Sequence, residues 1–129
     1  MKKTIATHAA PAAIGPYSQA IQVDGTLYIS GQIPVNPADG TIPEGIEAQT
    51  RRSLENIGAI LKEAGMDFGN VVKTTVLLQD LGDFARMNAV YAEFFPATKP
   101  ACVCCQVAAL PKGALVEIDA IAAADRPSD

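Results

Sequence analysis

The segment 46–64 constrains the fold of this chain more than any other part of its sequence. Apolar and small residues recur there at steps of three and four, which places them along one face of a helix. The residues on that face are Ile46, Thr50, Leu54, Ile57, Leu61 and Ala64. Gly65 follows directly and suits the left-handed conformation that commonly ends a helix. The sequence therefore predicts an amphipathic helix over 46–64, whose apolar face must pack against another layer.

Strand-like segments lie on both sides of this helix. Asp24-Gly25 favours a type I′ turn, in which both central residues have positive φ, and predicts a hairpin of strands 17–23 and 26–33. β-branched residues predict another strand over 71–79. Two further strands are expected over 101–108 and 115–123, with a turn at 110–113 between them.

A second helix is predicted between Asp83, which can cap its N-terminus, and Pro96, which ends it. The residues expected to face inward are Phe84, Met87, Tyr91 and Phe94 or Phe95. The resulting order, β-β-α-β-α-β-β, predicts a single α+β domain over residues 1–129. In such a domain both helices lie on one face of a mixed sheet.

The other face of that sheet is expected to be non-polar as well. Along the predicted strand 71–79, apolar residues and threonines occupy both sides, and Lys73 is the only charged residue. A sheet with two non-polar faces, but helices for only one of them, usually buries the other face against a partner. The sequence therefore predicts an oligomer.

Composition argues against several classes of function. The chain has 129 residues and a net charge of −4, and its ten Lys and Arg residues are scattered, which disfavours a nucleic-acid partner. No apolar run approaches the ~18 residues of a membrane-spanning helix, so no membrane partner is expected. The cysteines are odd in number and crowded at 102, 104 and 105. This pattern favours a reducing, cytoplasmic location over a disulfide framework.

Two carboxylates are candidates for chemistry. Glu117 and Asp119 lie two apart on a predicted strand, so they share one face at a spacing of ~6.6 Å. On an open face the pair would simply be solvated. In a pocket between subunits, burial would raise the pKa of Glu117 toward the working pH and suit it to general acid or base catalysis. Both interpretations stand at this point.

Other polar positions allow a structural or a functional interpretation. Asn88 falls within the apolar stripe of the second helix and can either orient a ligand or bond to neighbouring backbone. Gly31, between Ser30 and Gln32, permits close backbone approach to a ligand but is also ordinary turn material. Cys102 and Cys104 share one strand face. No metal is expected, because structural zinc normally needs four ligands and buried cysteines are mostly inert.

Five blocks of the sequence, in order, resemble the RidA (YjgF/YER057c/UK114) family. They are APAAIGPYSQA at 10–20, YISGQIP at 28–34, VKTTV at 72–76, VAALPKG at 107–113 and VEI at 116–118. The resemblance implies a chorismate-mutase-like α+β subunit in a homotrimer, with sites in clefts between subunits. It also implies cofactor-free hydrolysis of reactive 2-imino or enamine acids to 2-keto acids and ammonia.

The same resemblance assigns roles to individual residues. It implies catalytic roles for Glu117 and Tyr17. The substrate-binding positions that it implies are Ser30, Gly31, Asn88, Cys102 and Cys104. Cys102 is a departure, because deaminases of the family carry an arginine there that grips the substrate carboxylate, and a thiol offers no positive charge. Lys99 is the one lysine nearby in the sequence.

The sequence therefore leaves a choice of functions. The first is a RidA-like imine deaminase, weak or altered in specificity because of Cys102. The alternative is a non-catalytic or differently specific metabolite-binding trimer. An endoribonuclease, an activity sometimes attached to the family's name, is disfavoured by the acidic charge. A redox-responsive chaperone would depend on the cysteine cluster.

Overall fold

The computed structural model describes residues 1–125. The strands and α-helices are β1 (Lys2–Ile5), β2 (Ala20–Val23), β3 (Thr26–Gln32), α1 (Ile46–Glu63), β4 (Val71–Leu78), α2 (Phe84–Phe94), β5 (Ala101–Gln106) and β6 (Val116–Ala123). Three short 3-10 helices complete them, namely η1 (Phe68–Asn70), η2 (Leu81–Asp83) and η3 (Pro111–Gly113). Within residues 1–125, no helix combines the length and the apolar character needed to cross a membrane.

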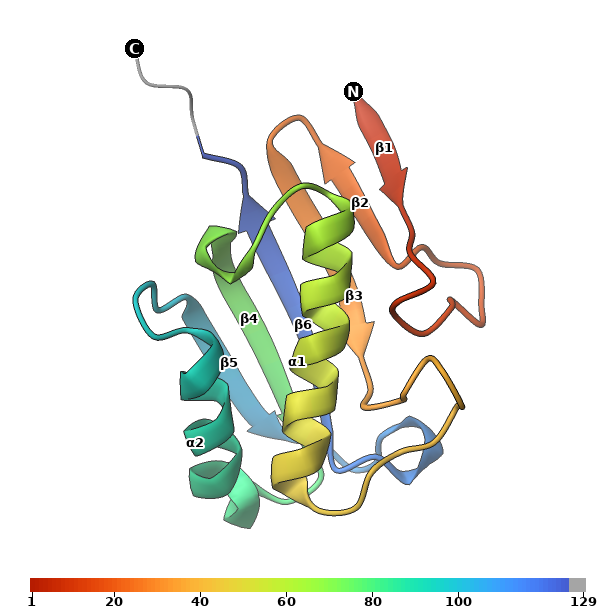
Figure 1. Cartoon of the computed structure of the whole chain (residues 1–129). Coiled ribbons are helices and arrows are strands. Elements are labelled where there is room, and N and C mark those ends of the chain that lie inside the picture. Colours follow the sequence, from red (N-terminus) through yellow and green to blue (C-terminus); the bar gives the residue numbers. More distant parts are fainter. Residues whose placement is uncertain (126–129) are drawn as a thin grey trace.

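The strands form one six-stranded sheet in the order β1-β2-β3-β6-β4-β5. All neighbouring pairs are antiparallel except β4 and β5, which run parallel. Figure 1 shows α1 and α2 packed side by side on the same face of this sheet. The predicted α+β architecture, a mixed sheet with both helices on one face, is therefore confirmed.

Helix α1 follows the predicted apolar stripe closely. Its inward residues are almost completely buried, with Leu54, Ile57 and Leu61 at most 1% exposed. Burying one such side chain stabilises the fold by about 1.5–3 kcal/mol, so this face anchors the helix layer on the sheet. Gly65 takes a φ of 75° directly after the helix, as its predicted role at the C-terminus requires.

The N-terminal part differs from prediction in three ways. The strand expected from residue 17 begins only at Ala20, because the N–H of Tyr17 bonds back to the carbonyl of Gly15 at 2.8 Å. The turn at Asp24-Gly25 is present, but only Asp24 has a left-handed φ, 54°, so it is not the type I′ turn predicted. Strand β1 was not predicted, because it has no alternating apolar pattern and buries only Ile5.

Helix α2 also corrects two predictions. The carboxylate of Asp83 accepts a hydrogen bond from Arg86 at 2.6 Å and does not cap the helix. Phe84 is 44% exposed, whereas Met87 and Phe95 are buried as predicted. Since Phe84 opens the helix, its ring lies at the rim of the gap between α2 and β5 and not in the core.

The two C-terminal strands are both present but are not neighbours. β6 lies between β3 and β4, which leaves β5 as an edge strand paired only with β4. Tyr28 and Val103 are about half exposed. Tyr28 alternates with the buried Leu27 and Ile29, and Val103 alternates with Cys102 and Cys104, which face α2. The sheet face away from the helices therefore carries large apolar side chains, as expected.

Candidate functional site

An irregularity in the pairing of β3 with β6 shapes the first part of the site. Ser30 and Gly31 stand opposite the single residue Asp119, because the register shifts between Ile29 and Gln32. Such a bulge bends the strand and re-aims its residues, and bulges are frequent beside functional sites. The bulge brings the backbone of residue 31 toward the carboxylate face of β6.

Glu117 lies directly against Gly31. A Cβ atom built on residue 31 would lie 3.0 Å from Cδ and 3.2 Å from Cγ of Glu117, and closer still to Oε2. Any side chain at position 31 would therefore displace the carboxyl group. The neighbours Val116 and Ile118 are fully buried under the helices, which fixes Glu117 on the other face of β6.

Burial changes the acidity of this carboxyl group. Removal of Glu117 from water raises its pKa above the ordinary value, and the negative charge of Asp119 raises it further. Asp119 itself is held in place, because its Oδ1 accepts a hydrogen bond from the N–H of Thr75 at 3.0 Å. A carboxyl group with a raised pKa is better matched to accepting and returning protons near neutral pH.

Ser30 and Tyr17 belong to the same region. The hydroxyl of Ser30 donates to the carbonyl of Ser18 at 2.6 Å, and its N–H donates to the carbonyl of Gln19 at 2.9 Å. These bonds tie the N-terminal loop to the bulge. Tyr17 and Gly31 consequently line one hollow of about 210 Å³. We call this space the loop hollow.

The remaining candidate residues meet in a second hollow between α2 and β5. It is lined by Val76, Phe84, Met87, Asn88, Tyr91, Cys102 and Cys104. Cys102 and Cys104 thus face α2 together, as strand alternation predicted. Asn88 is exposed at the rim and does not occupy the buried position that its place in the apolar stripe allowed. We call this second space the helix-side hollow.

The polar groups of the helix-side hollow are neutral. The hydroxyls of Tyr91 and Thr74 lie 2.7 Å apart, and burial raises the pKa of Tyr91 to about 12, with nearby Cys102 adding to the shift. Burial, followed by the neighbouring thiols, also raises the pKa of Cys104. This hollow can offer a ligand hydrogen bonds from uncharged groups.

Within one chain the candidates therefore form two separate groups. Tyr17, Ser30, Gly31 and Glu117 gather around the bulge, whereas Asn88, Cys102 and Cys104 lie on the helix side of the edge strand. In the part of the chain from 1 to 125, no three His, Cys, Asp or Glu side chains come together as a metal site.

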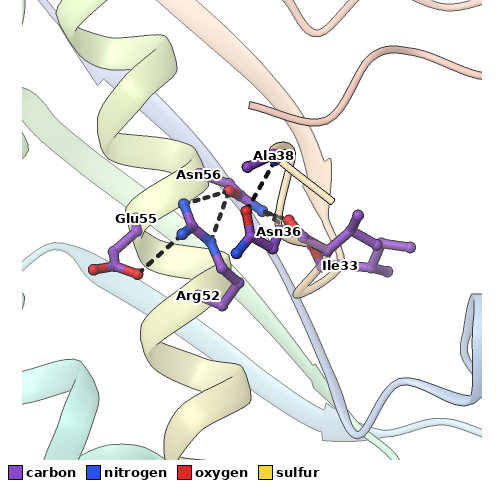
Figure 2. A network of polar contacts seen from close by, with 7 residues as sticks. Ile33, Asn36, Ala38, Arg52, Glu55 and Asn56 are labelled. Atoms are coloured by element: carbon purple, nitrogen blue, oxygen red, sulfur yellow. Dashed lines mark hydrogen bonds and ion pairs between the residues drawn. The ribbon is translucent and has the colours of Figure 1, made fainter. Parts of the chain in front are cut away.

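Two buried amides that the sequence analysis did not single out hold the walls of the loop hollow. Figure 2 shows the first, Asn56 on α1, which is 0% exposed. Its Nδ2 donates to the carbonyls of Ile33 and Val35 at 3.3 and 3.0 Å. Its Oδ1 accepts two bonds from the guanidinium of Arg52, at 3.1 and 2.9 Å. The loop after β3 is thereby fixed to the helix.

Gln19 does the same for the N-terminal loop and is 6% exposed. Its Nε2 donates to the carbonyls of Pro11 and Thr7 at 2.7 and 3.1 Å, and its Oε1 accepts from the N–H of Thr7 at 2.7 Å. A polar amide beside the apolar stripe, such as Asn56 next to Ile57, was the available signal for this role.

Known proteins resemble this chain over almost its whole length. The family model described as "Endoribonuclease L-PSP" matches residues 7–124. The 2-iminobutanoate/2-iminopropanoate deaminase of Mus musculus is 54% identical over 95% of this chain and 91% of its own length. The protein of that name in Escherichia coli (strain K12) is 53% identical over 95% of this chain and 98% of its own length.

Solved structures agree with the sequence relatives. E. coli TdcF with bound serine superposes with a TM-score of 0.93 at 48% identity, covering 95% of this chain and 99% of that one. The YjgF gene product from E. coli gives a TM-score of 0.91 at 52% identity, covering 94% and 98%. With the family model spanning 7–124 and relatives above 50% identity, the chain belongs to the endoribonuclease L-PSP (YjgF/RidA) family.

Proposed function

We propose that this protein hydrolyses 2-imino acids to 2-keto acids and ammonia, the activity named for its relatives. The observation that carries the proposal is the half-buried carboxyl group of Glu117, which has a raised pKa and packs on the bare backbone of Gly31. A water molecule beside this group would meet a stronger base than an ordinary exposed carboxylate.

The reaction needs one water molecule and the movement of its two protons. The water oxygen bonds to C2 of the imine, while Glu117 takes one proton from the water and returns it to the nitrogen. The product of this step is a carbinolamine. Its C–N bond then breaks, and Glu117 passes the hydroxyl proton to the departing nitrogen, so that ammonia and the 2-keto acid result. The phenol of Tyr17, a residue that lines the loop hollow together with Gly31, would hydrogen-bond the substrate.

The proposal includes a homotrimer in which each cleft lies between two subunits. It is supported by the apolar face that carries Tyr28 and Val103, and by the edge of β5, since an unprotected edge strand favours pairing with another chain. In that assembly the helix-side hollow of one copy, with Asn88 and Cys104, would complete the cleft of the next. A cytoplasmic location, and no role for nucleic acid, are part of the same proposal.

A second candidate function is binding of a metabolite without turnover. Cys102 favours it, because the helix-side hollow then lacks the cation that a substrate carboxylate would meet in related deaminases. A charged hydrogen-bond partner is worth about 2–5 kcal/mol when it is removed from a buried site. The two functions predict different turnover by the natural sequence.

The test measures ammonia and 2-keto acid release from freshly generated 2-iminobutanoate, for the wild type and for the Cys102→Arg and Glu117→Gln variants. We expect wild-type hydrolysis well above the buffer rate, loss of that rate in Glu117→Gln, and an equal or higher rate in Cys102→Arg. A wild-type rate equal to buffer, beside an active Cys102→Arg variant, would reject the deaminase and support the binding function.

A further inference from the structure

The loop hollow contains one charged group that the proposed reaction does not yet use. Among the residues that line it, only Lys112 carries a charge. Within residues 1–125 this lysine forms no ion pair with a carboxylate. Among the described residues Lys112 therefore has no carboxylate partner, and it lines the same space as Tyr17 and Gly31.

The backbone of Lys112 adds a second, independent observation. Lys112 has φ 57° and ψ 24°, a left-handed conformation that is unfavourable for residues other than glycine. Asp24 is the one other non-glycine residue with positive φ in the described chain, and it lies in a tight hairpin turn. A lysine thus stands at 112 where glycine would be less strained, and strained residues of this kind cluster at ligand sites.

The two loops that wall the loop hollow are held by hydrogen bonds, and the hollow is large enough for a small organic acid. Gln19 and Asn56, both buried, fix its two loop walls through the carbonyls described above. Walls that are held before binding reduce the ordering that a ligand must impose. At about 30 Å³ per water molecule, a volume of about 210 Å³ holds a small organic acid and the waters beside it.

We propose that Lys112 binds the carboxylate of the substrate and so determines the preference for 2-imino and 2-keto acids. This inference rests on the proposed function and names the cation that Cys102 does not supply. Gly31 lines the same hollow and lies against the carboxyl group of Glu117, so it connects the space beside Lys112 with the proposed base. Lys112 is therefore a specificity-determining residue, while proton transfer stays with Glu117.

The test measures binding of 2-oxobutanoate by calorimetry, with the neutral 2-oxobutanamide as the matched probe. Lys112→Met is expected to weaken 2-oxobutanoate binding roughly 2- to 10-fold and to leave 2-oxobutanamide binding unchanged. Lys112→Arg should restore most of the affinity. Lys62→Met, which removes an exposed lysine on α1, is the control and should bind as the wild type does. Equal affinity of Lys112→Met and wild type for 2-oxobutanoate would overturn the proposal.

Lys112→Gly separates ligand binding from folding. Because glycine tolerates the left-handed conformation, this variant should melt at the wild-type Tm or up to about 4 °C above it, yet bind 2-oxobutanoate as weakly as Lys112→Met. Wild-type affinity in this variant would contradict the inference. If 2-oxobutanoate binding depends on Lys112 but no imine is hydrolysed, only the proposed function is contradicted. If Lys112→Met hydrolyses the imine with an unchanged KM, only the role of Lys112 is contradicted.

Discussion

The residues around the bulge, Tyr17, Ser30, Gly31 and Glu117, form what we call the bulge region. This region and the helix-side hollow differ in the polar groups that they contain. Around the bulge, a carboxyl group with a raised pKa lies on bare backbone, and buried amides fix the adjoining loops. In the helix-side hollow, the polar groups are the thiols of Cys102 and Cys104 and the neutral phenol of Tyr91. In the function that we propose, proton transfer belongs to the first region and contact with uncharged groups to the second.

This division explains how the chain can carry a cysteine at 102 without disturbing Glu117. The two residues lie on opposite faces of the sheet, so the side chain of Cys102 does not set the burial of the carboxyl group. The pKa of Glu117 depends first on burial and then on Asp119, both within the bulge region. A change in the helix-side hollow should alter ligand preference more than proton transfer.

The largest effect should come from Glu117→Gln. This variant removes the base but keeps the shape of the side chain, so kcat for imine hydrolysis should fall about 10²- to 10⁴-fold. Binding of 2-oxobutanoate, measured by calorimetry, should change little. A decrease of less than threefold in kcat would show that Glu117 is not the base, and the assignment of proton transfer to the bulge region would then be wrong.

Gly31→Ala tests the close packing at the bulge. Its Cβ would lie 3.0 Å from Cδ of Glu117, so the carboxyl group must shift. We expect roughly 100-fold lower kcat/KM and about 1–3 kcal/mol less stability in denaturant unfolding. Gly25→Ala is the matched control, because its Cβ would have 3.8 Å to the nearest atom, Ala124. Equal losses in the two variants would show that the contact with Glu117 is unimportant.

Asp119→Asn should shift the pH profile and leave the maximal rate near that of the wild type. Asp119 raises the pKa of Glu117, so its neutralisation should lower that pKa and move the acid limb of kcat/KM to lower pH. This shift should be smaller than the total rise of the Glu117 pKa above its ordinary value, because burial is the larger cause of that rise. A limb that moves to higher pH would contradict the conclusion that Asp119 raises the pKa of Glu117.

Glu117→Gln should also raise stability at neutral pH. The folded state holds the proton of Glu117 more tightly than the unfolded state does, so wild-type stability falls as pH rises from the ordinary carboxyl pKa through the raised one. Glutamine lacks this penalty. Thermal melting should show a higher Tm than the wild type at pH 7, and the gain should disappear below pH ~4. The opposite pH trend would mean that the pKa is lowered.

The smallest effect is expected for Cys102→Ser. It replaces one neutral hydrogen-bonding group by another at an exposed position, so kcat and KM should stay within about threefold of wild type. A loss as large as that of Gly31→Ala would show that the thiol itself takes part in the reaction, and the contrast between the regions would then be wrong.

Sequence patterns correctly predicted the parts of the molecule that depend on interactions between residues close in the chain. Helix α1 and Gly65 follow from apolar spacing and from the left-handed preference of glycine. Strand β1 escaped prediction because its pairing with β2 is a long-range event that buries only Ile5. The bulge was not predicted for the same reason, because the register of β3 and β6 depends on the whole sheet.

The residue types of the candidate site could be predicted from the sequence, but the separation of these residues into two groups could not. Alternation along β6 and β5 placed Glu117 and the pair Cys102 and Cys104 on defined strand faces. That these faces point to opposite sides of one sheet follows from strand order, which no local pattern encodes. Lys112 was part of a family block, and only its backbone conformation and its place in the loop hollow give it a role.

We propose that each active cleft joins the bulge region of one copy to the helix-side hollow of the next. Mixing two variants that are each expected to have little activity alone, Glu117→Gln without the base and Asn88→Ala without the substrate contact, tests it most directly after dissociation and reassembly. If neighbours share clefts, random trimers of the two variants regain about a quarter of the wild-type clefts, and activity should rise well above both parents. Activity at the mean of the two parents would contradict the account, because each cleft would then be complete within one chain.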